Sequence, residues 1–229
     1  ERTMDKRKIF IHIPKNAGMT IRHSPYLKNK ILLNHKSRLI NSKYAGDLAR
    51  KMKQIGDHHG YEHARWRDLA HDYRNSHTAF AIIRNPWDRV KSRYHFIKDM
   101  IIDGKHPSDY ADVSSFEAFL EERFKWGNEP FMWHRAVRGW YPAWDHVSDK
   151  TGEKCQVDII RFGHLNEEIM KYFNLKTMSR ARNVTKFSEA EYTNKTIQIV
   201  ADWYQKDIDY WGFDFDTEAQ KNYYFEKNC

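Results

Sequence analysis

The chain has 229 residues, of which 40% are hydrophobic and 15% aromatic, and this composition excludes a disordered protein because such chains cannot form an apolar core. The formal net charge is +8, and it is unevenly spread: residues 1–100 hold 22 basic and 9 acidic side chains, whereas residues 101–229 hold 17 and 22. The basic half predicts an anionic partner, which could be a nucleotide, a nucleic acid, an acidic glycan or a membrane surface.

The first hundred residues predict strands that alternate with helices. Residues 8–13 are rich in β-forming side chains and predict a first strand, and Ile31–Leu33 predicts a second. Residues 45–55 predict a helix that ends at a glycine, and residues 61–73 predict another from apolar side chains at helical spacing.

Residues 78–83 form a continuous apolar run, which predicts a strand buried on both faces of a sheet. The helix after it has a clear start, since Asn85 suits the N-cap, Pro86 the first turn and Asp88 the positive helix end. Its apolar side chains recur every three or four residues, at Trp87, Val90, Tyr94, Ile97 and Ile101.

The second half of the chain continues this alternation. Ser114 and Glu117 predict a capping box for a helix, residues 157–162 predict a strand, and residues 166–173 predict a helix. Ser188 and Glu191 predict a second capping box, ahead of one long helix that ends at Gly212. The apolar positions of that helix are Ile197, Val200, Ala201, Tyr204, Ile208 and Trp211.

These elements together predict an α/β fold with a mainly parallel sheet. No repeat and no Gly-, Ser- or Pro-rich linker divides the chain, so residues 1–229 are expected to form a single domain.

The loop after the first strand has the composition of an anion site. Its small residues let backbone N–H groups turn toward one point, while Lys15 adds a positive charge and Thr20 a hydroxyl donor. It is not a Walker A loop, because Lys15 precedes the single glycine, Gly18. An ordinary strand-to-helix turn is the alternative interpretation. The loop consists of Pro14, Lys15, Asn16, Ala17, Gly18, Met19 and Thr20.

A second anion-binding segment follows residues 78–83. Arg84 ends this strand, where parallel α/β sheets place their ligands, and Ser92 lies two turns into the next helix. A guanidinium and a hydroxyl together suit a phosphate monoester. Arg89 and Arg93 either join this site or pair with carboxylates on a solvated helix face.

Both segments resemble motifs of the sulfotransferases that use 3′-phosphoadenosine 5′-phosphosulfate (PAPS). Residues 14–20 resemble the 5′-phosphosulfate loop of that family, and residues 84–89 with Ser92 and Tyr94 resemble its 3′-phosphate motif. The carbohydrate branch, with the heparan 2-O- and chondroitin sulfotransferases and their microbial and viral relatives, is the best match. Further similarity at residues 158–168, 183–186 and 207–213 extends the resemblance over most of the chain.

Two positions depart from the family pattern. Met19 stands where the family usually has Thr or Ser, which leaves Thr20 as the hydroxyl donor of the loop. Gly163 and His164 replace a Glu-Asn pair, so the role of that segment is open.

The resemblance implies a P-loop-like three-layer fold, with a central mainly parallel sheet flanked by helices. It implies transfer of a sulfuryl group from PAPS to an acceptor hydroxyl, with adenosine 3′,5′-bisphosphate as product and no metal. Lys15 would neutralise the leaving oxygen, residues 14–20 would hold the 5′-phosphate, and Arg84 and Ser92 would hold the 3′-phosphate. Lys186 would lie near the nucleotide. Residues 1–100 would thus carry the main nucleotide motifs, and residues 101–229 the acceptor side and C-terminal helices.

The resemblance also places a catalytic base after the second helix, in a histidine-rich stretch. His59 is the first choice and His58 and His63 are the alternatives, because imidazole accepts a proton near neutral pH. Each of them could equally be a surface or helix-capping histidine. Residues 59–63 also match the His-x-x-Glu-His pattern of zinc peptidases, but Gly60 weakens the helix that both ligands would share.

The expected acceptor is a carbohydrate hydroxyl, and a peptide tyrosine or a small metabolite is the alternative. The aromatic side chains of residues 131–133, 140–141 and 144 either form an acceptor platform or pack in the core. A nucleotide phosphotransferase is disfavoured by the lack of a Walker A loop. A nucleic-acid-binding module is the non-enzyme alternative, but its basic residues would follow an exposed helix rather than strand ends, so no nucleic-acid partner is expected.

No apolar run reaches the ~18 residues of a membrane span, so no span is expected in this chain. The two cysteines, Cys155 and Cys229, cannot form a disulfide framework. We expect a cytoplasmic protein if the source is microbial or viral, and a protein of the Golgi lumen if the chain was trimmed behind an anchor.

Overall fold

The computed structural model describes residues 7–34, 38–56, 60–126, 139–178, 192–217 and 219. Four strands form one fully parallel sheet in the order β2-β1-β3-β4, as the alternation of strands and helices predicts. The strands are β1 (Lys8–Ile11), β2 (Ile31–Leu33), β3 (Ala79–Ile83) and β4 (Asp158–Arg161).

The strand order reverses its direction beside β1. The chain passes from β1 to β2 on one side, and then crosses back to β3 on the other side of β1. In open parallel sheets, the loops leaving two such strands diverge to opposite faces and open a crevice at the carboxyl edge. The loops after β1 and β3 therefore meet at the place where this fold can hold a ligand.

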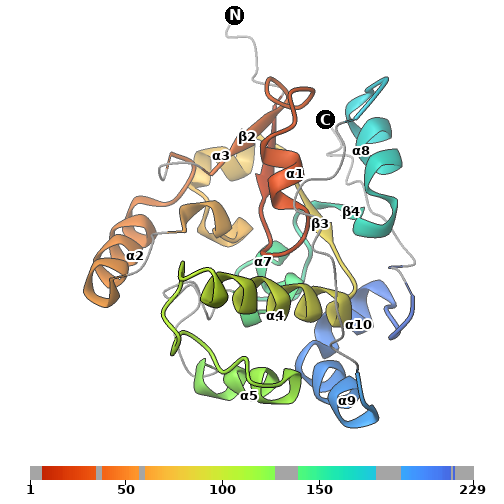
Figure 1. The fold of residues 1–229 in the computed structure, drawn as a ribbon. Helices are drawn as coiled ribbons and strands as arrows, with labels where there is room; N and C mark the ends of the chain where they lie inside the picture. The colour runs from red at the N-terminus through yellow and green to blue at the C-terminus, as the bar shows by residue number, and fades with distance from the viewer. Residues whose placement is uncertain are drawn as a thin grey trace, which may run out of the picture.

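Alternate residues of each strand enter two different hydrophobic clusters, which makes the fold three layers deep (Figure 1). Ile9 and Ile11 face the larger cluster, in which the sheet packs on α4, α5, α7, α9 and α10. Phe10 faces the smaller cluster, which α1 and α8 cover through Ile21 and Ile169. All five residues of β3 are buried, as its uninterrupted apolar sequence predicts.

The α-helices in the described ranges are α1 (Gly18–Arg22), α2 (Ser42–Ile55), α3 (His71–Ser76), α4 (Pro86–Ile102), α5 (Phe116–Trp126), α7 (Ala143–Val147), α8 (Leu165–Phe173), α9 (Asn194–Trp203) and α10 (Gln205–Trp211). Three short 3₁₀ turns join them: η1 (Tyr61–His63), η2 (Trp66–Asp68) and η3 (Phe162–His164). None of these helices combines the length and apolarity that a membrane crossing requires.

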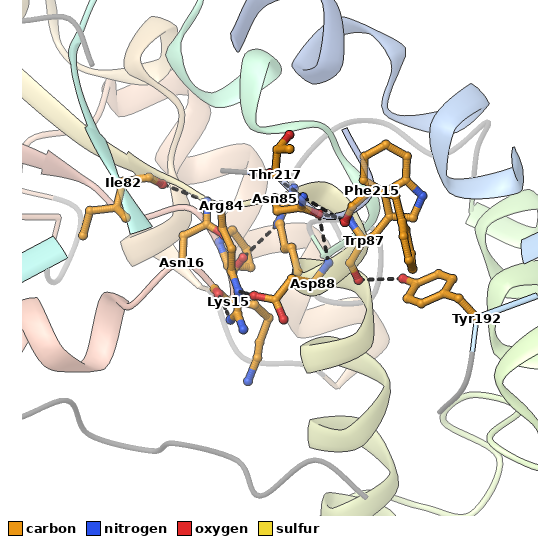
Figure 2. Close-up of polar contacts among 12 residues, drawn as sticks. Lys15, Asn16, Ile82, Arg84, Asn85, Trp87, Asp88, Tyr192, Phe215 and Thr217 are labelled. Atoms are coloured by element: carbon orange, nitrogen blue, oxygen red, sulfur yellow. Dashed lines mark hydrogen bonds and ion pairs between the residues drawn. The ribbon is translucent and has the colours of Figure 1, made fainter. Parts of the chain in front are cut away.

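The start of α4 has the predicted cap. The Asn85 side chain accepts hydrogen bonds from the backbone N–H groups of Trp87 and Asp88, at 3.0 and 3.3 Å, and Pro86 occupies the first turn. The Asn85 amide also donates to the carbonyl oxygens of Asp214 and Thr217, each at 2.8 Å (Figure 2). One side chain thus caps α4 and holds the segment after α10 against it.

The prediction of one helix over residues 61–73 is wrong. Two 3₁₀ turns and α3 occupy this stretch, and residues between them are extended, with ψ of 141° at Ala64 and 150° at Leu69. Asp68 accepts hydrogen bonds from the backbone and the guanidinium of Arg65, which closes η2 after one turn. Leu69 then pairs with Ile40 in an isolated bridge, which requires extended backbone.

The prediction of one long helix up to Gly212 is also wrong, although Gly212 does end it. The helix breaks at Tyr204, with φ −108° and ψ 26°, into α9 and α10. The break lets the buried Asp207 carboxylate accept the N–H groups of Ala143 and Trp144, both at 2.8 Å, at the start of α7. A buried polar partner therefore overrides the continuous apolar periodicity.

Two predicted capping boxes have different outcomes. The cap of α5 is Ser115 rather than Ser114, since the Ser115 hydroxyl accepts from Ala118 N–H at 3.0 Å. Ser114 instead donates to Asp112, and Glu117 pairs with Lys195. The box predicted at Ser188 and Glu191 lies outside the described residues.

Candidate functional site

A cavity of about 1120 Å³ lies at the carboxyl edge of β1 and β3, where the strand order reverses. Its walls come from the loop after β1, from one face of α4, from η1 and from the turn after β4. This volume slightly exceeds the range of about 300–1,000 Å³ that is usual for small-molecule pockets. The cavity therefore has room for a nucleotide together with part of a second molecule.

The two predicted anion-binding segments contact each other directly. The Arg84 guanidinium donates through Nη1 to the carbonyl oxygen of Lys15 at 2.8 Å, and the Asn16 amide donates to the carbonyl oxygen of Ile82 at 2.8 Å (Figure 2). Lys15 and Ala17 have positive φ values of 67° and 58°, so the loop backbone is held in a left-handed conformation that these residues seldom adopt. The bonds from the β3 side hold this strained loop in place.

Arg84 has two further neighbours. Its Nε donates to the Asp88 carboxylate at 2.5 Å, and the guanidinium lies over the Phe162 ring, 4.2 Å from the centroid. Arg84 is therefore oriented from the loop, from α4 and from the turn after β4, while remaining part of the cavity wall.

Arg89 and Arg93 do not lie on a solvated helix face. Arg89 is only 2% exposed and donates to the carbonyl oxygens of Pro14 and Tyr141, at 3.0 and 2.8 Å. It therefore holds the loop from its buried side. Arg93 is buried, lines the cavity, and lies over the Trp140 ring. The interpretation of these two arginines as surface ion-pair partners is wrong.

Lys15 is a buried cation beside other cations. Its Nζ lies 4.2 Å from the centroid of the Phe96 ring, and among the described residues no carboxylate lies within ion-pair distance of it. Burial, together with the positive charges of Arg84 and Arg93, lowers the Lys15 pKa to about 8, while Asp99 acts in the opposite direction. Because this ammonium is buried and lies near other cations, an anionic ligand would stabilise its charged form.

Gly18 is required by a close approach. A Cβ at this position would lie 1.6 Å from Nε2 of His12, so any side chain here would collide with the imidazole. His12 is buried between the loop and the Phe10 ring. Burial first, and then the charges of His63 and Arg22, hold the His12 pKa well below its usual value, so His12 is neutral.

His63 is positioned to accept a proton. Its Nδ1 lies 2.9 Å from the carbonyl oxygen of His12, and because a carbonyl can only accept, Nδ1 carries the proton of the neutral ring. The lone pair is then on Nε2, which lies 3.9 Å from the Glu62 carboxylate. Both side chains line the cavity, so Nε2 can act as a base there and the carboxylate can stabilise the resulting imidazolium.

The structure brings most of the predicted site residues to this one cavity. Lys15, Arg84, Ser92 and His63 line it, as do Pro14, Ala17, Gly18, Met19 and Thr20. Asn16 is buried behind the loop, where it donates to Ile82. His58, His59 and Lys186 lie outside the described residues.

The structure bears in part on two alternative interpretations, the zinc site at residues 59–63 and the aromatic acceptor platform. Residues 61–63 form a 3₁₀ turn after Gly60, whose φ is 64°, rather than the α-helix that a His-x-x-Glu-His site needs. Within the described ranges no three His, Cys, Asp or Glu side chains gather to hold a metal. Trp140 and Trp144 are buried core residues, and residues 131–133 lie outside the described ranges.

Several residues that line the cavity were not predicted from the sequence. Asp88, Phe96 and Met100 share the cavity face of α4 with Ser92 at four-residue intervals, a spacing that could have identified them. Glu62 and the pair His106 and Tyr110 carried no comparable signal, because tertiary contacts alone bring them to the cavity.

Comparisons with known proteins find no match for this chain among family models, curated proteins or solved structures. Its function therefore has to be inferred from the chemistry of the cavity.

We expect Gly18→Ala to lower the free energy of unfolding by about 1–3 kcal/mol, because the added methyl group collides with His12. Gly46→Ala in α2 is the matched control. Nothing lies within 4 Å of a Cβ added at Gly46, so this substitution should raise the free energy of unfolding by roughly 0.5–1 kcal/mol. Urea unfolding measures both. In a His12→Ala background the penalty of Gly18→Ala should shrink, and an unchanged penalty would contradict the collision.

Proposed function

We propose that this chain is a PAPS-dependent sulfotransferase that transfers a sulfuryl group to an acceptor hydroxyl on a carbohydrate. The observation that carries the proposal is the hydrogen bond from Arg84 to the Lys15 carbonyl oxygen, because it joins the two motifs around one cavity. A ligand that spans them needs an anionic group at each end.

The residues of the cavity fit the nucleotide. Arg84 and Ser92, on the wall formed by the end of β3 and α4, would hold the 3′-phosphate through a guanidinium and a hydroxyl. Lys15 would hold the 5′-phosphosulfate, together with the N–H groups of the first turn of α1, which have no acceptor within the helix. The lowered pKa of Lys15 supports this placement, because it reflects burial first and then the charges of Arg84 and Arg93, and a bound anion would offset both.

The bound nucleotide supplies the sulfuryl group and leaves as adenosine 3′,5′-bisphosphate. Lys15 places its ammonium where charge develops on the leaving phosphate oxygen. His63 receives the proton of the acceptor hydroxyl on Nε2, while its Nδ1–H remains bound to the His12 carbonyl oxygen. Glu62 stabilises the charge that His63 gains.

Two other functions have weaker support. A nucleotide phosphotransferase would require an acidic metal site, and no three His, Cys, Asp or Glu side chains gather in the part of the chain that the structure describes. A nucleic-acid-binding module would expose its key basic side chains, whereas Arg84, Arg89 and Arg93 are buried. A peptide tyrosine or a small metabolite remains the alternative acceptor, and transfer to labelled acceptors of each kind distinguishes them.

Ser92→Ala should weaken the binding of adenosine 3′,5′-bisphosphate about 10- to 100-fold, the value of one hydrogen bond to a charged group. Its affinity for adenosine 5′-phosphate should be unchanged, because that nucleotide lacks the 3′-phosphate. Isothermal titration calorimetry measures both. Equal losses for the two nucleotides, or no loss for either, would place the 3′-phosphate elsewhere.

Binding of adenosine 3′,5′-bisphosphate should weaken as the pH rises through about 8, because the free protein then loses the Lys15 proton that the bound anion requires. The phosphates themselves titrate near pH 6, so they stay fully charged over this range. Lys15→Arg, which keeps its charge, should remove the dependence between about pH 7.5 and 9.5. A decline that persists in Lys15→Arg would assign the titration to another group.

His63→Gln should lower the rate of sulfuryl transfer about 100- to 10,000-fold, the usual contribution of a general base. The dissociation constant for adenosine 3′,5′-bisphosphate should stay the same, since His63 acts on the acceptor. Single-turnover measurements with PAPS separate the two quantities. A variant with the rate of the unmodified protein would move the base to another histidine, with His59 and His58 tested next.

A further inference from the structure

Helix α4 forms one long wall of the cavity, and its side chains mark successive positions along the cavity. Asp88, Ser92, Phe96 and Met100 line the cavity one turn apart, and Ser92 and Met100 are separated by about 12 Å along the axis at the usual rise of 1.5 Å per residue. The Lys15 ammonium lies over Phe96, midway between them. With the 3′-phosphate at Ser92, the part of the cavity at Met100 lies beyond the sulfuryl group, on the acceptor side.

A stacked pair of aromatic rings lines the acceptor side of the cavity. The rings of His106 and Tyr110 are parallel within 3°, with centroids 4.1 Å apart, and both line the cavity together with Met100 and Ile97. The backbone N–H of His106 donates to the Met100 carbonyl oxygen at 3.0 Å, and that of Tyr110 donates to Pro107 at 3.0 Å. These bonds fix the ring pair to the end of α4. Because the stacked rings cover each other's inner faces, the pair offers an acceptor the preordered outer face of one ring.

Among the described residues, the charges that line the cavity leave no positive surplus for an anionic acceptor. Among the described residues its wall has four cationic side chains, Lys15, Arg22, Arg84 and Arg93, and three carboxylates, Glu62, Asp88 and Glu167. PAPS alone brings about four negative charges, since a phosphate monoester carries nearly two and the phosphosulfate carries two more. Against the side chains that the structure describes, a second anion would therefore meet an excess of negative charge.

The carboxylates near the reacting groups favour an uncharged partner with hydroxyl groups. Glu62 lies beside His63, and Asp99 acts electrostatically on Lys15. Carboxylates accept hydrogen bonds from hydroxyls and repel other carboxylates. The outer ring face matches the apolar C–H face of a sugar, and the Glu62 carboxylate in the cavity wall matches its hydroxyl groups.

We propose that Met100, His106 and Tyr110 form the acceptor subsite, and that the acceptor is a neutral sugar ring rather than a uronic acid or a sulfated glycan. This inference rests on the proposed sulfotransferase function and names the substrate class of the same site. It narrows the expected carbohydrate hydroxyl to one on an uncharged sugar.

The test uses pairs of acceptors that differ only in charge: the 4-nitrophenyl β-glycosides of glucose and glucuronic acid, and those of galactose and galacturonic acid. Transfer from labelled PAPS by the full chain should proceed with a kcat/KM at least 10-fold higher for the neutral member of a pair. The polyuronates heparosan and chondroitin, and a tyrosine-containing peptide, serve as the competing acceptor classes. Preference for any of these, or transfer to none of the neutral glycosides, overturns the proposal.

The assignment of the subsite has its own variants. Tyr110→Ala and His106→Ala should each raise the KM for the preferred neutral glycoside at least 10-fold and leave the affinity for adenosine 3′,5′-bisphosphate unchanged. Tyr26→Ala is the matched control, because Tyr26 is 44% exposed and lies outside the cavity wall, and it should change neither value. An unchanged KM in a folded Tyr110→Ala or His106→Ala protein overturns the subsite.

The two proposals fail in different ways. If adenosine 3′,5′-bisphosphate does not bind the unmodified protein, the sulfotransferase function itself is wrong. If the nucleotide binds and a uronic acid or a peptide is the better acceptor, only the neutral-sugar subsite is wrong.

Discussion

The hydrogen bond from the Arg84 guanidinium to the Lys15 carbonyl oxygen joins two segments that are 69 residues apart in the sequence. Together with the bonds from Asn16 to Ile82 and from Arg89 to Pro14, it holds the loop after β1 against the end of β3. The loop needs this support, because Lys15 and Ala17 adopt positive φ values that cost free energy. The position of the Lys15 ammonium, and hence the proposed anion-binding chemistry, depends on these contacts.

The site places positive charge where water cannot solvate it well. Burial first, and then the charges of Arg84 and Arg93, lower the pKa of Lys15, and Arg89 is also buried next to the loop. Such an arrangement is unfavourable in the free protein, and the anion that we propose as ligand would make it favourable. The neutral His12 fits the same pattern, since a further charge beside the loop would add to the repulsion.

Strong local signals explain which parts of the fold could be predicted. The uninterrupted apolar run of β3 and the Asn85–Pro86 start of α4 each determine their own structure, and they also carry Arg84 and Ser92. The turns at residues 61–73 and the break at Tyr204 could not be predicted, because distant partners determine them: Ile40 pairs with Leu69, and the start of α7 requires Asp207.

In the candidate site too, some features depend on local sequence and others on distant partners. The cavity position of the residues in the proposed anion site could be predicted, because consecutive loop and helix positions carry them. The proton-accepting atom that we propose on His63 could not be predicted, since the ring tautomer depends on the carbonyl group of His12, 51 residues away. The stacked rings of His106 and Tyr110 likewise become part of the cavity only through the turn that fixes them to α4.

The most direct test of the account is a crystal structure of the protein with adenosine 3′,5′-bisphosphate. The account predicts that the 3′-phosphate contacts Arg84 and Ser92, and that the 5′-phosphate lies in the loop of residues 14–20 with the Lys15 ammonium moved from Phe96 onto it. A nucleotide bound in the reverse orientation, or outside this cavity, would contradict the central claim.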